Sequence, residues 1–242
     1  MSDQSTSARQ PLLSIVIPTY QHGGEIAECL QSVLKQSFTD YEIIVVNDGS
    51  TDNTLEALKP FLGKITLINQ ENRGGNAARN RGFDASKGEF VLFCDADIVM
   101  RPDMLEVMLG TLRNNPQASY AYSSFRFGWK VFRLWPFDGD KLRRMNYIHT
   151  TSLLRREHFP RFDEKIRRLQ DWDLWLTMLE QGHVGVWIPE FLFRAIPHRG
   201  GISTWVPGVF YRLPWRKFGL RIDTVEKFLE AERIMRAKHH LS

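Results

Sequence analysis

The sequence predicts an α/β domain built on a mostly parallel β-sheet flanked by helices. Two observations lead to this prediction. Short apolar runs alternate four times with stretches of helical periodicity over the first half of the chain, which is typical of strand–helix–strand units in a parallel sheet. The run Phe90–Cys94 is apolar throughout and rich in aromatic and branched residues, as in a strand that is buried on both faces of a sheet.

The composition is that of a globular domain. Of the 242 residues, 43% are hydrophobic and 25% are charged, so the chain is long enough and apolar enough to bury a large core. The net charge of +4 permits an anionic substrate or a membrane surface without requiring either, and we expect no nucleic-acid partner. Cys29 and Cys94 lie in apolar segments, which favours buried free thiols in a reducing compartment.

The N-terminal residues do not have the pattern of a secretion signal. The first ten residues are polar and lack the apolar core of a secretion signal, so residues 1–11 are expected to form a disordered tail. No stretch approaches the ~20 apolar residues of a membrane span. We therefore expect a cytoplasmic protein whose membrane contact is limited to peripheral binding at the inner face.

The expected elements follow in chain order. Leu13–Pro18 is a first buried strand that ends at Pro18. Residues 25–36 have the apolar spacing of an amphipathic helix, and residues 41–46 form a second strand that runs into a turn rich in helix-capping residues. The remaining strands expected from the same patterns are 65–68, 89–97, 184–189 and 191–196. The remaining helices are 55–62, 77–82, 104–112, 170–182 and 225–239.

Two carboxylates, Asp95 and Asp97, follow the central apolar run directly. If the backbone stays extended, both side chains leave the same side of it. Ligands of open α/β sheets bind at the carboxyl ends of the strands. Oxygen ligands at that place suit Mg²⁺ or Mn²⁺, which usually bridge to phosphates. The alternative is that both acids cap the helix that begins near Pro102.

Other polar residues also follow predicted strands: Thr19 and Tyr20, Asp48, and the loop Asn72–Asn76. Because parallel strands point their carboxyl ends the same way, these residues would line one crevice. Each of them alone is explained by turn chemistry. The glycine motifs of P-loop nucleotidases and of dinucleotide enzymes are absent, and no Cys/His cluster has the spacing of a zinc site.

In combination, five segments of the chain resemble family 2 glycosyltransferases of the GT-A fold. They are Ser14–Tyr20, Val46–Asp52, Asn72–Gly82, Cys94–Asp97 and Gln170–Trp175. The resemblance implies a Rossmann-like sheet within a glycosyltransferase domain over residues 12–205. Residues 12–100 would form its nucleotide-binding half and residues 101–205 its acceptor-side half. Residues 206–242 would form an amphipathic, helical C-terminal extension.

The resemblance also implies roles for individual residues. A nucleoside-diphosphate sugar, with UDP or dTDP as the nucleotide, would be bound by Pro18, Thr19, Tyr20, Asp48, Asn76, Asp95 and Arg199. Asp97 and His198 would ligate the Mg²⁺ or Mn²⁺ that neutralises the diphosphate. A lone histidine such as His198 is also commonly structural or exposed. The glycine pair after Arg199 suggests a loop that closes on the diphosphate.

Asp171 matches the position where this family has its catalytic base. The chemistry requires a base, because an acceptor hydroxyl must lose its proton as it attacks the anomeric carbon opposite the leaving group. The alternative is that Asp171 only caps the helix. Gln170 replaces the acidic residue that is usual before this aspartate, which makes Asp173 a second candidate. We prefer Asp171, because Asp173 lies on another face of the predicted helix.

Two further regions are assigned by the resemblance. Asn146, Thr151 and Ser152 lie where the family binds its acceptor, here a saccharide or a lipid-linked hydroxyl. A strand with ordinary hydroxyls explains the same residues. The basic, aromatic segment 210–222 either lies on an anionic membrane surface or packs on the core as a terminal helix.

The sequence therefore predicts an inverting, metal-dependent glycosyltransferase of the hexosyltransferase type, acting in polysaccharide or cell-envelope synthesis. One alternative is a nucleotide-sugar pyrophosphorylase, although residues 21–25 lack the basic pair that such an enzyme has after its first strand. The other is a nucleotide-sugar or polysaccharide binding protein with an inactive site. The intact set of Asp48, Asp97 and Asp171 argues against this second alternative.

Overall fold

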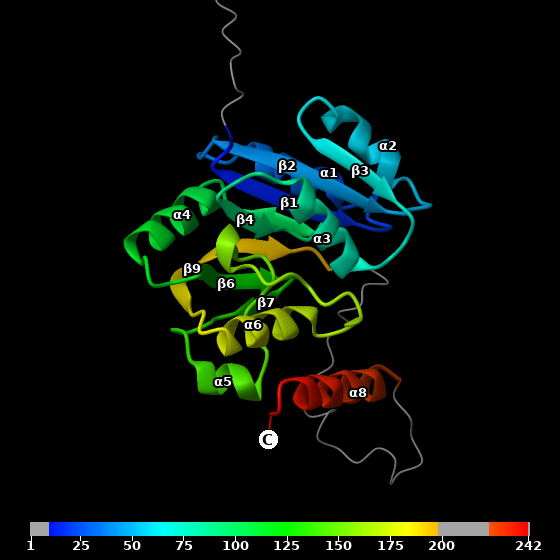
Figure 1. Ribbon diagram of the computed structural model, residues 1–242. Helices are drawn as coiled ribbons and strands as arrows, with labels where there is room; N and C mark the ends of the chain where they lie inside the picture. The colour runs from blue at the N-terminus through cyan, green and yellow to red at the C-terminus, as the bar shows by residue number, and fades with distance from the viewer. Residues whose placement is uncertain (1–9, 198–222, 242) are drawn as a thin grey trace, which may run out of the picture.

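The computed structural model describes residues 10–197 and 223–241, and its described strands join into a single sheet (Figure 1). Nine strands take part, in the order β3-β2-β1-β4-β8-β6-β9-β5, with β7 paired to β6. Three predicted features lie outside the described residues: residues 1–9 of the tail predicted over 1–11, the pair His198 and Arg199, and the basic segment 210–222.

The first four strands form a parallel unit. β1 (Leu13–Thr19) lies between β2 (Tyr41–Asp48) and β4 (Phe90–Phe93), and β3 (Thr66–Gln70) is the outer strand. The segments between these strands are helical: α1 (Ile26–Leu34), α2 (Thr54–Leu58) with a 3₁₀ turn (Lys59–Phe61), and α3 (Gly75–Ala85). The predicted alternation of strand and helix is confirmed here.

Pro18 does not end the first strand, contrary to the prediction. β1 continues to Thr19, and Pro18 is in register with Val46 of β2. The carbonyl of Val16 accepts a hydrogen bond from the backbone N–H of Cys94 (2.9 Å), so even-numbered residues of β1 turn their backbone groups toward β4. At Pro18 that side lies past the end of β4. The missing N–H of proline therefore removes no hydrogen bond from the ladder.

The second half of the chain adds antiparallel pairings. β8 (Leu153–Arg155) is antiparallel to both β4 and β6 (Tyr120–Phe127). β6 runs parallel to β9 (Gly185–Ala195), while β5 (Ile98–Met100) and β7 (Lys130–Phe132) pair antiparallel with β9 and β6. Because two antiparallel steps separate β6 from β4, these two strands run in the same direction. The carboxyl end of β6 therefore lies at the same edge of the sheet as those of β1, β2 and β4.

The two strands predicted for residues 184–196 are one strand, β9. Its register against β6 shifts at two consecutive places, because Ser123 faces Ile188, Ser124 faces Phe191 and Phe125 faces Phe193. Pro189, Glu190 and Leu192 have no partner in this register, so the strand is bulged here. A bulge leaves residues unpaired, which accommodates a proline without an N–H. The sequence break at Pro189 thus marks an irregularity within a strand and not a loop.

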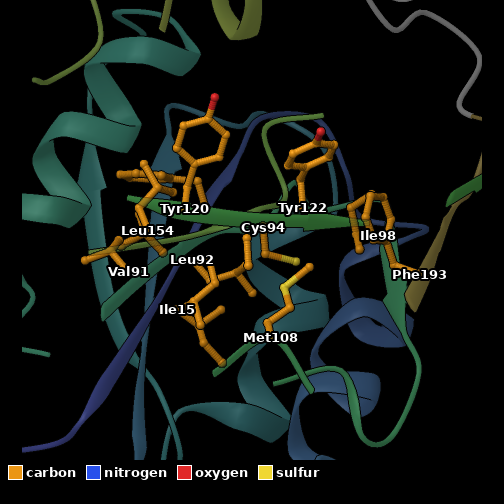
Figure 2. Packing of buried hydrophobic residues seen from close by; sticks show 14 of the residues in the cluster. Ile15, Val91, Leu92, Cys94, Ile98, Met108, Tyr120, Tyr122, Leu154 and Phe193 are labelled. Carbon is orange, nitrogen blue, oxygen red and sulfur yellow. The ribbon is translucent and has the colours of Figure 1, made fainter. Parts of the chain in front are cut away.

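The core lies between the sheet and its helices, as Figure 2 shows for side chains from β1, β4, β6 and α4 (Met104–Asn114). All residues of β1 and β4 are buried, which agrees with the predicted two-sided burial. Cys29 and Cys94 are buried free thiols, as predicted, with their Sγ atoms 3.8 Å apart. Within the described ranges, no helix combines the length and the apolar character needed to cross a bilayer.

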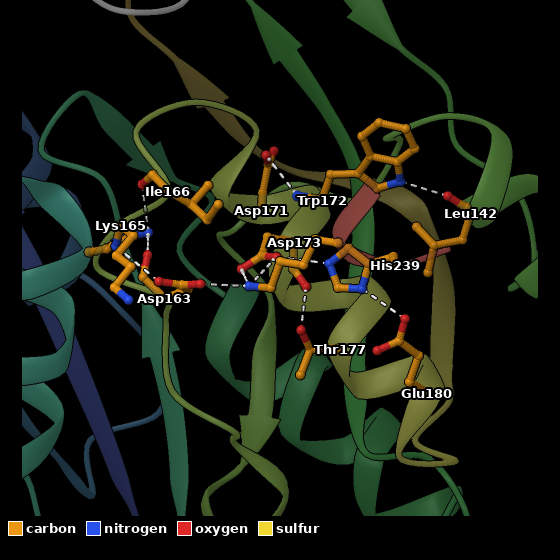
Figure 3. A network of polar contacts seen from close by, with 12 residues as sticks. Leu142, Asp163, Lys165, Ile166, Asp171, Trp172, Asp173, Thr177, Glu180 and His239 are labelled. Carbon is orange, nitrogen blue, oxygen red and sulfur yellow. Dashed lines mark hydrogen bonds and ion pairs between the residues drawn. The ribbon is translucent and has the colours of Figure 1, made fainter. Parts of the chain in front are cut away.

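An ion-pair network joins α6 (Gln170–Glu180) to the end of α8 (Asp223–Lys238), as Figure 3 shows. The side chain of Asp173 is 4% exposed, and one of its oxygens lies 2.8 Å from Nε2 of His239. Nδ1 of the same imidazole lies 2.8 Å from Glu180. Lys238 donates to Asp173 (3.0 Å) and to Asp163 (2.8 Å). These contacts attach the C-terminal helix to the helix that carries Asp171.

The protonation of His239 follows from its partners. Burial lowers the pKa of His239, whereas the hydrogen bonds to Asp173 and Glu180 raise it. The hydrogen bonds outweigh burial, so the pKa lies above its ordinary value. An imidazole with a carboxylate at each nitrogen is stabilised as the cation. His239 therefore stays charged to a higher pH than a free imidazole does.

This network predicts a stability that depends on pH. A folded pKa above the unfolded value of about 6.5 means that the contribution of His239 is complete below that pH. The contribution is lost as the pH rises through the folded pKa. We expect the free energy of unfolding, measured by denaturant titration, to fall over that range, and His239→Gln to remove this part of the profile. The control is His240→Gln, at an exposed neighbour. An identical profile in His239→Gln would show that the imidazole is not charged in the fold.

Candidate functional site

The loops after β1 and β2 are tied together at the carboxyl edge of the sheet. Oε1 of Gln21 accepts hydrogen bonds from the backbone N–H groups of Thr51 (2.9 Å) and Asp52 (3.0 Å). Next to this junction, Thr19 is buried and Tyr20 is 46% exposed. The hydroxyl of Thr19 has no hydrogen-bond partner in the described part of the chain. This edge therefore offers a ligand one unpaired hydroxyl and one accessible aromatic ring.

Asp48, at the end of β2, holds the glycine-bearing loop that leads into α3. Its buried carboxylate accepts hydrogen bonds from Nε2 of Gln70 (2.8 Å) and from the backbone N–H groups of Arg73 (2.9 Å) and Gly74 (2.8 Å). Gly74 has φ +96°, a conformation that favours glycine. Asp48, which is predicted to bind the nucleotide-sugar, thus also fixes the conformation of the neighbouring loop.

The buried polar face of α3 holds the segment that precedes α6. Nδ2 of Asn76 donates to the carbonyls of Asp163 (2.8 Å) and Ile166 (3.1 Å). Asn80 bonds the backbone of Phe162 in both directions, at 2.9 and 3.0 Å. We refer to Asn76, Arg79 and Asn80 as the polar face of α3. These contacts join the first half of the chain to the helix that carries Asp171.

The backbone turns at the two aspartates that follow β4. The N–H of Ile98 donates to the carbonyl of Asp95 (3.0 Å) and closes a turn. The backbone is therefore not extended here, and the prediction that both carboxylates leave one side of a strand is wrong. The carbonyl of Asp97 accepts from the N–H of Ile196 (2.8 Å), which fixes the end of β9 beside the turn.

Asp95 forms an ion pair with Arg79, with 2.6 Å between carboxylate and guanidinium. The Arg79 side chain is 10% exposed and that of Asp95 is 29% exposed. Burial raises the pKa of Asp95, but the charge of Arg79 and the hydrogen bond that Arg79 donates lower it, so the net pKa lies below its usual value. Nη1 of Arg79 also reaches Oδ1 of Asn76 (3.3 Å). An ionised Asp95 is thereby attached to the polar face of α3.

His149 is influenced by the charges of two carboxylates that are far apart in the sequence. Burial lowers its pKa, while the charges of Asp95 and Asp171 oppose this. Its Nδ1 accepts from the backbone N–H of Thr151 (3.0 Å), so the proton of the neutral ring is on Nε2. Arg79 pairs with Asp95, and Asn76 and Asn80 hold the residues just before α6, so α3 attaches both the turn after β4 and the segment that leads to Asp171. His149 was not predicted from the sequence, since a single histidine among hydroxyl residues carries no pattern.

The two acidic residues of α6 have different surroundings. Asp171 is partly exposed in the first turn, and its Oδ1 accepts from the N–H of Trp172 (3.0 Å). Figure 3 shows it pointing away from the network around Asp173 and His239. Trp172 and Trp175 fix the helix through indole hydrogen bonds to α5 (Gly139–Arg144) and to residue 148. The carboxylate of Asp173 is thus bound by Lys238 and His239, whereas the carboxylate of Asp171 is partly accessible to solvent.

The residues predicted for acceptor binding lie in an irregular segment between α5 and β8. Thr151 and Ser152 are buried, and Ser152 donates to the carbonyl of His149 (2.8 Å). Oδ1 of Asn146 and Oγ1 of Thr151 have no partner among the residues described. A buried polar atom without a partner costs about 1–3 kcal/mol. Such atoms are frequent where a ligand completes the hydrogen bonding.

The metal prediction depends on Asp97. Its side chain is partly exposed in the turn after β4. Over residues 10–197 and 223–241, no group of three or more His, Cys, Asp and Glu side chains is arranged to hold a metal. A magnesium ion is often held by one or two carboxylates and completes its shell with water and substrate phosphates. Asp97 therefore fits a cation that binds together with a diphosphate.

Comparison with known proteins assigns the family. The model of the family described as Glycosyl transferase family 2 matches residues 14–172. The chain belongs to this family. The resemblance to this family that was noted in the sequence is confirmed, and the matched range contains Asp48, Asp95, Asp97 and Asp171.

The chain is similar to part of several longer glycosyltransferases. It is 40% identical over 100 residues to the uncharacterized glycosyltransferase YibD of Escherichia coli, covering 40% of this chain and 29% of that protein. It is 31% identical over 195 residues to a hyaluronan synthase of Pasteurella multocida, covering 72% of this chain and 19% of the synthase. The chain therefore spans less than a third of the length of these two relatives.

Solved structures show the same fold. The S. aureus TarS fragment 1–349 in complex with UDP-GlcNAc matches with a TM-score of 0.67 at 22% identity, covering 83% of this chain and 63% of that one. A mannosyltransferase from Pyrobaculum calidifontis, in complex with GDP-Man and Mn²⁺, matches with a TM-score of 0.65 at 21% identity, covering 81% and 60%. The predicted α/β fold of the GT-A type is confirmed.

The ion pair beneath the site predicts a cost in stability when it is broken. Arg79→Met leaves Asp95 as an uncompensated, partly buried charge, and we expect a loss of about 2–3 kcal/mol in the free energy of unfolding. Arg81 lies on the same helix but is exposed, so Arg81→Met should change stability by no more than about 0.5 kcal/mol. Denaturant titration of both variants measures this. Equal stabilities would contradict the structural role given to Arg79.

Proposed function

We propose that this chain is an inverting glycosyltransferase. It transfers a sugar from a nucleoside-diphosphate sugar, with UDP or dTDP as the nucleotide, to a hydroxyl of a saccharide or lipid-linked acceptor. The observation that carries the proposal is the set of contacts made by α3: Arg79 pairs with Asp95 in the turn after β4, and Asn76 and Asn80 hold residues 162–166 just before α6. These contacts support a single site in which a strand-end carboxylate serves the donor and the helix carboxylate Asp171 serves the attacking hydroxyl.

Donor binding is assigned to the carboxyl edge of the first strands. The unpaired hydroxyl of Thr19 and the exposed ring of Tyr20 suit hydrogen bonding to, and stacking on, a nucleoside. Pro18 lies beside Thr19 in β1, and Asp48 accepts a hydrogen bond from Gly74 of the loop before α3. Asn76 connects the start of α3 to the backbone of Asp163. The TarS structures that contain UDP and UDP-GlcNAc support a nucleotide-sugar as the class of donor. Arg199 is assigned to the diphosphate from the family resemblance.

Asp171 is assigned as the base. It accepts the proton of the acceptor hydroxyl while the oxygen attacks the anomeric carbon, and the nucleoside diphosphate leaves from the opposite face. Attack opposite the leaving group inverts the anomeric configuration. Asp173 is unsuited to this role, because His239 and Lys238 occupy its carboxylate. Asn146, Thr151 and Ser152 are assigned to acceptor binding, supported by the unpaired buried atoms of Asn146 and Thr151.

A divalent cation is part of the proposal. Asp97 would hold it, with His198 assigned as a second ligand from the family resemblance. When bound, Mg²⁺ or Mn²⁺ neutralises negative charge that develops on the leaving diphosphate. The mannosyltransferase structure that contains GDP-Man and Mn²⁺ supports this cofactor class. Arg79 keeps Asp95 ionised next to the same turn.

The organisation of the chain is proposed on the same basis. Residues 12–100 form the nucleotide-binding half, residues 101–205 the acceptor-binding half, and residues 206–242 an extension whose helix α8 attaches to α6. We place the activity on the cytoplasmic face of the membrane, in the synthesis of a polysaccharide or of another cell-envelope saccharide.

The assignment of the base predicts a separation of binding from turnover. Asp171→Asn keeps the shape of the side chain but cannot take a proton, so we expect turnover to fall by about 10²–10⁴-fold. Nucleotide affinity, measured by calorimetry with UDP, should stay within about twofold, since Asp171 is assigned to the acceptor side. Turnover is followed as UDP or dTDP release from a panel of nucleotide-sugars.

The matched control for this variant is Asp140→Asn, because the Asp140 side chain is 82% exposed on α5. It should keep the wild-type rate. Turnover of Asp171→Asn near the wild-type value would mean that another group is the base. A wild-type chain that binds nucleotide but turns over no donor would favour the binding-protein alternative.

The metal assignment predicts that nucleotide affinity depends on Mn²⁺ through Asp97. We expect Mn²⁺ to tighten UDP binding by at least about tenfold relative to chelator, because the cation offsets the diphosphate charge. Asp97→Asn should lose this increase and bind UDP equally with and without Mn²⁺. Calorimetry measures both, with Asp140→Asn again as the control. Equal affinity and turnover of the wild type in chelator would remove the metal from the proposal.

A further inference from the structure

The hairpin of β6 and β7 carries an exposed aromatic residue at its tip. Trp129 is 87% exposed, more than any other large apolar side chain in the described residues, and Val131 next to it is 49% exposed. Gly128 has φ +55° and makes the tight turn between the strands. An indole that is exposed to water on a short hairpin does not gain the free energy that burial of its apolar surface would provide. Its exposure therefore suggests a partner for the tip.

The charge around the tip identifies the chemistry of that partner. No Asp or Glu occurs from residue 107 to residue 137, whereas the hairpin contains Arg126, Lys130 and Arg133 at its tip and base. The guanidiniums of Arg126 and Arg133 lie over one Phe191 ring, at 5.5 and 5.4 Å from its centroid. Neither forms an ion pair within the described ranges. The surface beside Trp129 is therefore cationic, and it complements an anionic partner.

The topology places this tip next to the proposed active site. β6 runs in the same direction as β4, so its end projects past the same carboxyl edge of the sheet as Asp95. The N–H of Gly128 donates to the carbonyl of Ala195 (3.1 Å), and the next residue, Ile196, donates to the carbonyl of Asp97 (2.8 Å). The tip is thus connected through the end of β9 to the turn that carries Asp97.

We propose that the β6–β7 tip docks on an anionic membrane surface. Trp129 enters the headgroup region, where indole rings are favoured, and Arg126, Lys130 and Arg133 face the lipid phosphates. Docking at this point brings the carboxyl edge of the sheet against the bilayer. It follows that the acceptor is resident in the membrane, and this last step rests on the proposed function, whereas docking itself does not.

The test is co-sedimentation of the full chain with vesicles, without donor or acceptor. We expect strong binding to phosphatidylcholine vesicles with ~30% phosphatidylglycerol and weak binding to phosphatidylcholine alone. The binding should weaken as ionic strength rises from about 0.05 to about 0.5 M. Trp129→Ala should lower the partition coefficient about tenfold, and Arg126→Gln and Arg133→Gln about fivefold each. Leu62→Ala, at a site that is 50% exposed, should leave it unchanged.

A spectroscopic readout reports on the tip directly. Anionic vesicles should shift the tryptophan emission of the wild type to shorter wavelength, and Trp129→Phe should lose this shift. The proposal is overturned if the wild type does not bind these vesicles, or if Trp129→Ala binds them as the wild type does. A Trp129→Ala variant that keeps vesicle binding but has a higher KM for a water-soluble saccharide acceptor would make the tip a sugar-stacking surface instead. Because no donor is present in the binding assay, failure of docking and failure of sugar transfer are observed separately.

Discussion

The polar face of α3 is the constraint on which the rest of the site depends. Asn76 and Asn80 are buried, and their amide groups are satisfied by backbone groups of residues 162–166. Buried amides without these partners would be costly, so the segment before α6 is held in one place. That placement determines where α6 begins and therefore where Asp171 lies. Arg79 extends the same face to Asp95, which links the strand-end turn to the helix through one element.

The acidic residues of the site divide into those that hold the structure and those that remain accessible. Asp48 holds a loop, Asp95 is paired with Arg79, and Asp173 is bound by His239 and Lys238. Each of these carboxylates is compensated by specific donors, which is what makes its burial tolerable. Asp171 is partly exposed outside that network. The contacts of Asp173 with His239 and Lys238, and of Asp95 with Arg79, thus help to fix the position of Asp171.

The mixed sheet explains how elements from both halves of the chain come to one edge. The parallel strands alone would place only the first hundred residues there. β8 reverses the direction once and β6 reverses it again, so the end of β6 joins that edge. The same arrangement fixes the end of β9 beside Asp97. The proposed donor site, the proposed acceptor side and the β6–β7 tip are consequences of this strand order.

The sequence by itself determined the fold class, the parallel strands β1 to β4, β9, the helices other than α5, the buried free cysteines and the family, because periodicity and short motifs are local properties. The strands β5, β6 and β7 and the helix α5 were not predicted. Only the tertiary structure decided the roles of Arg79 and His149, the bulge at Pro189 and the continuation of β1 through Pro18. Asp173 could be separated from Asp171 by helical spacing, but its partner His239 is 66 residues away in the chain. Such pairings depend on which surfaces pack together, and no local pattern encodes that. His149 comes under the charges of Asp95 and Asp171 only in the folded chain, because these residues are distant in the sequence.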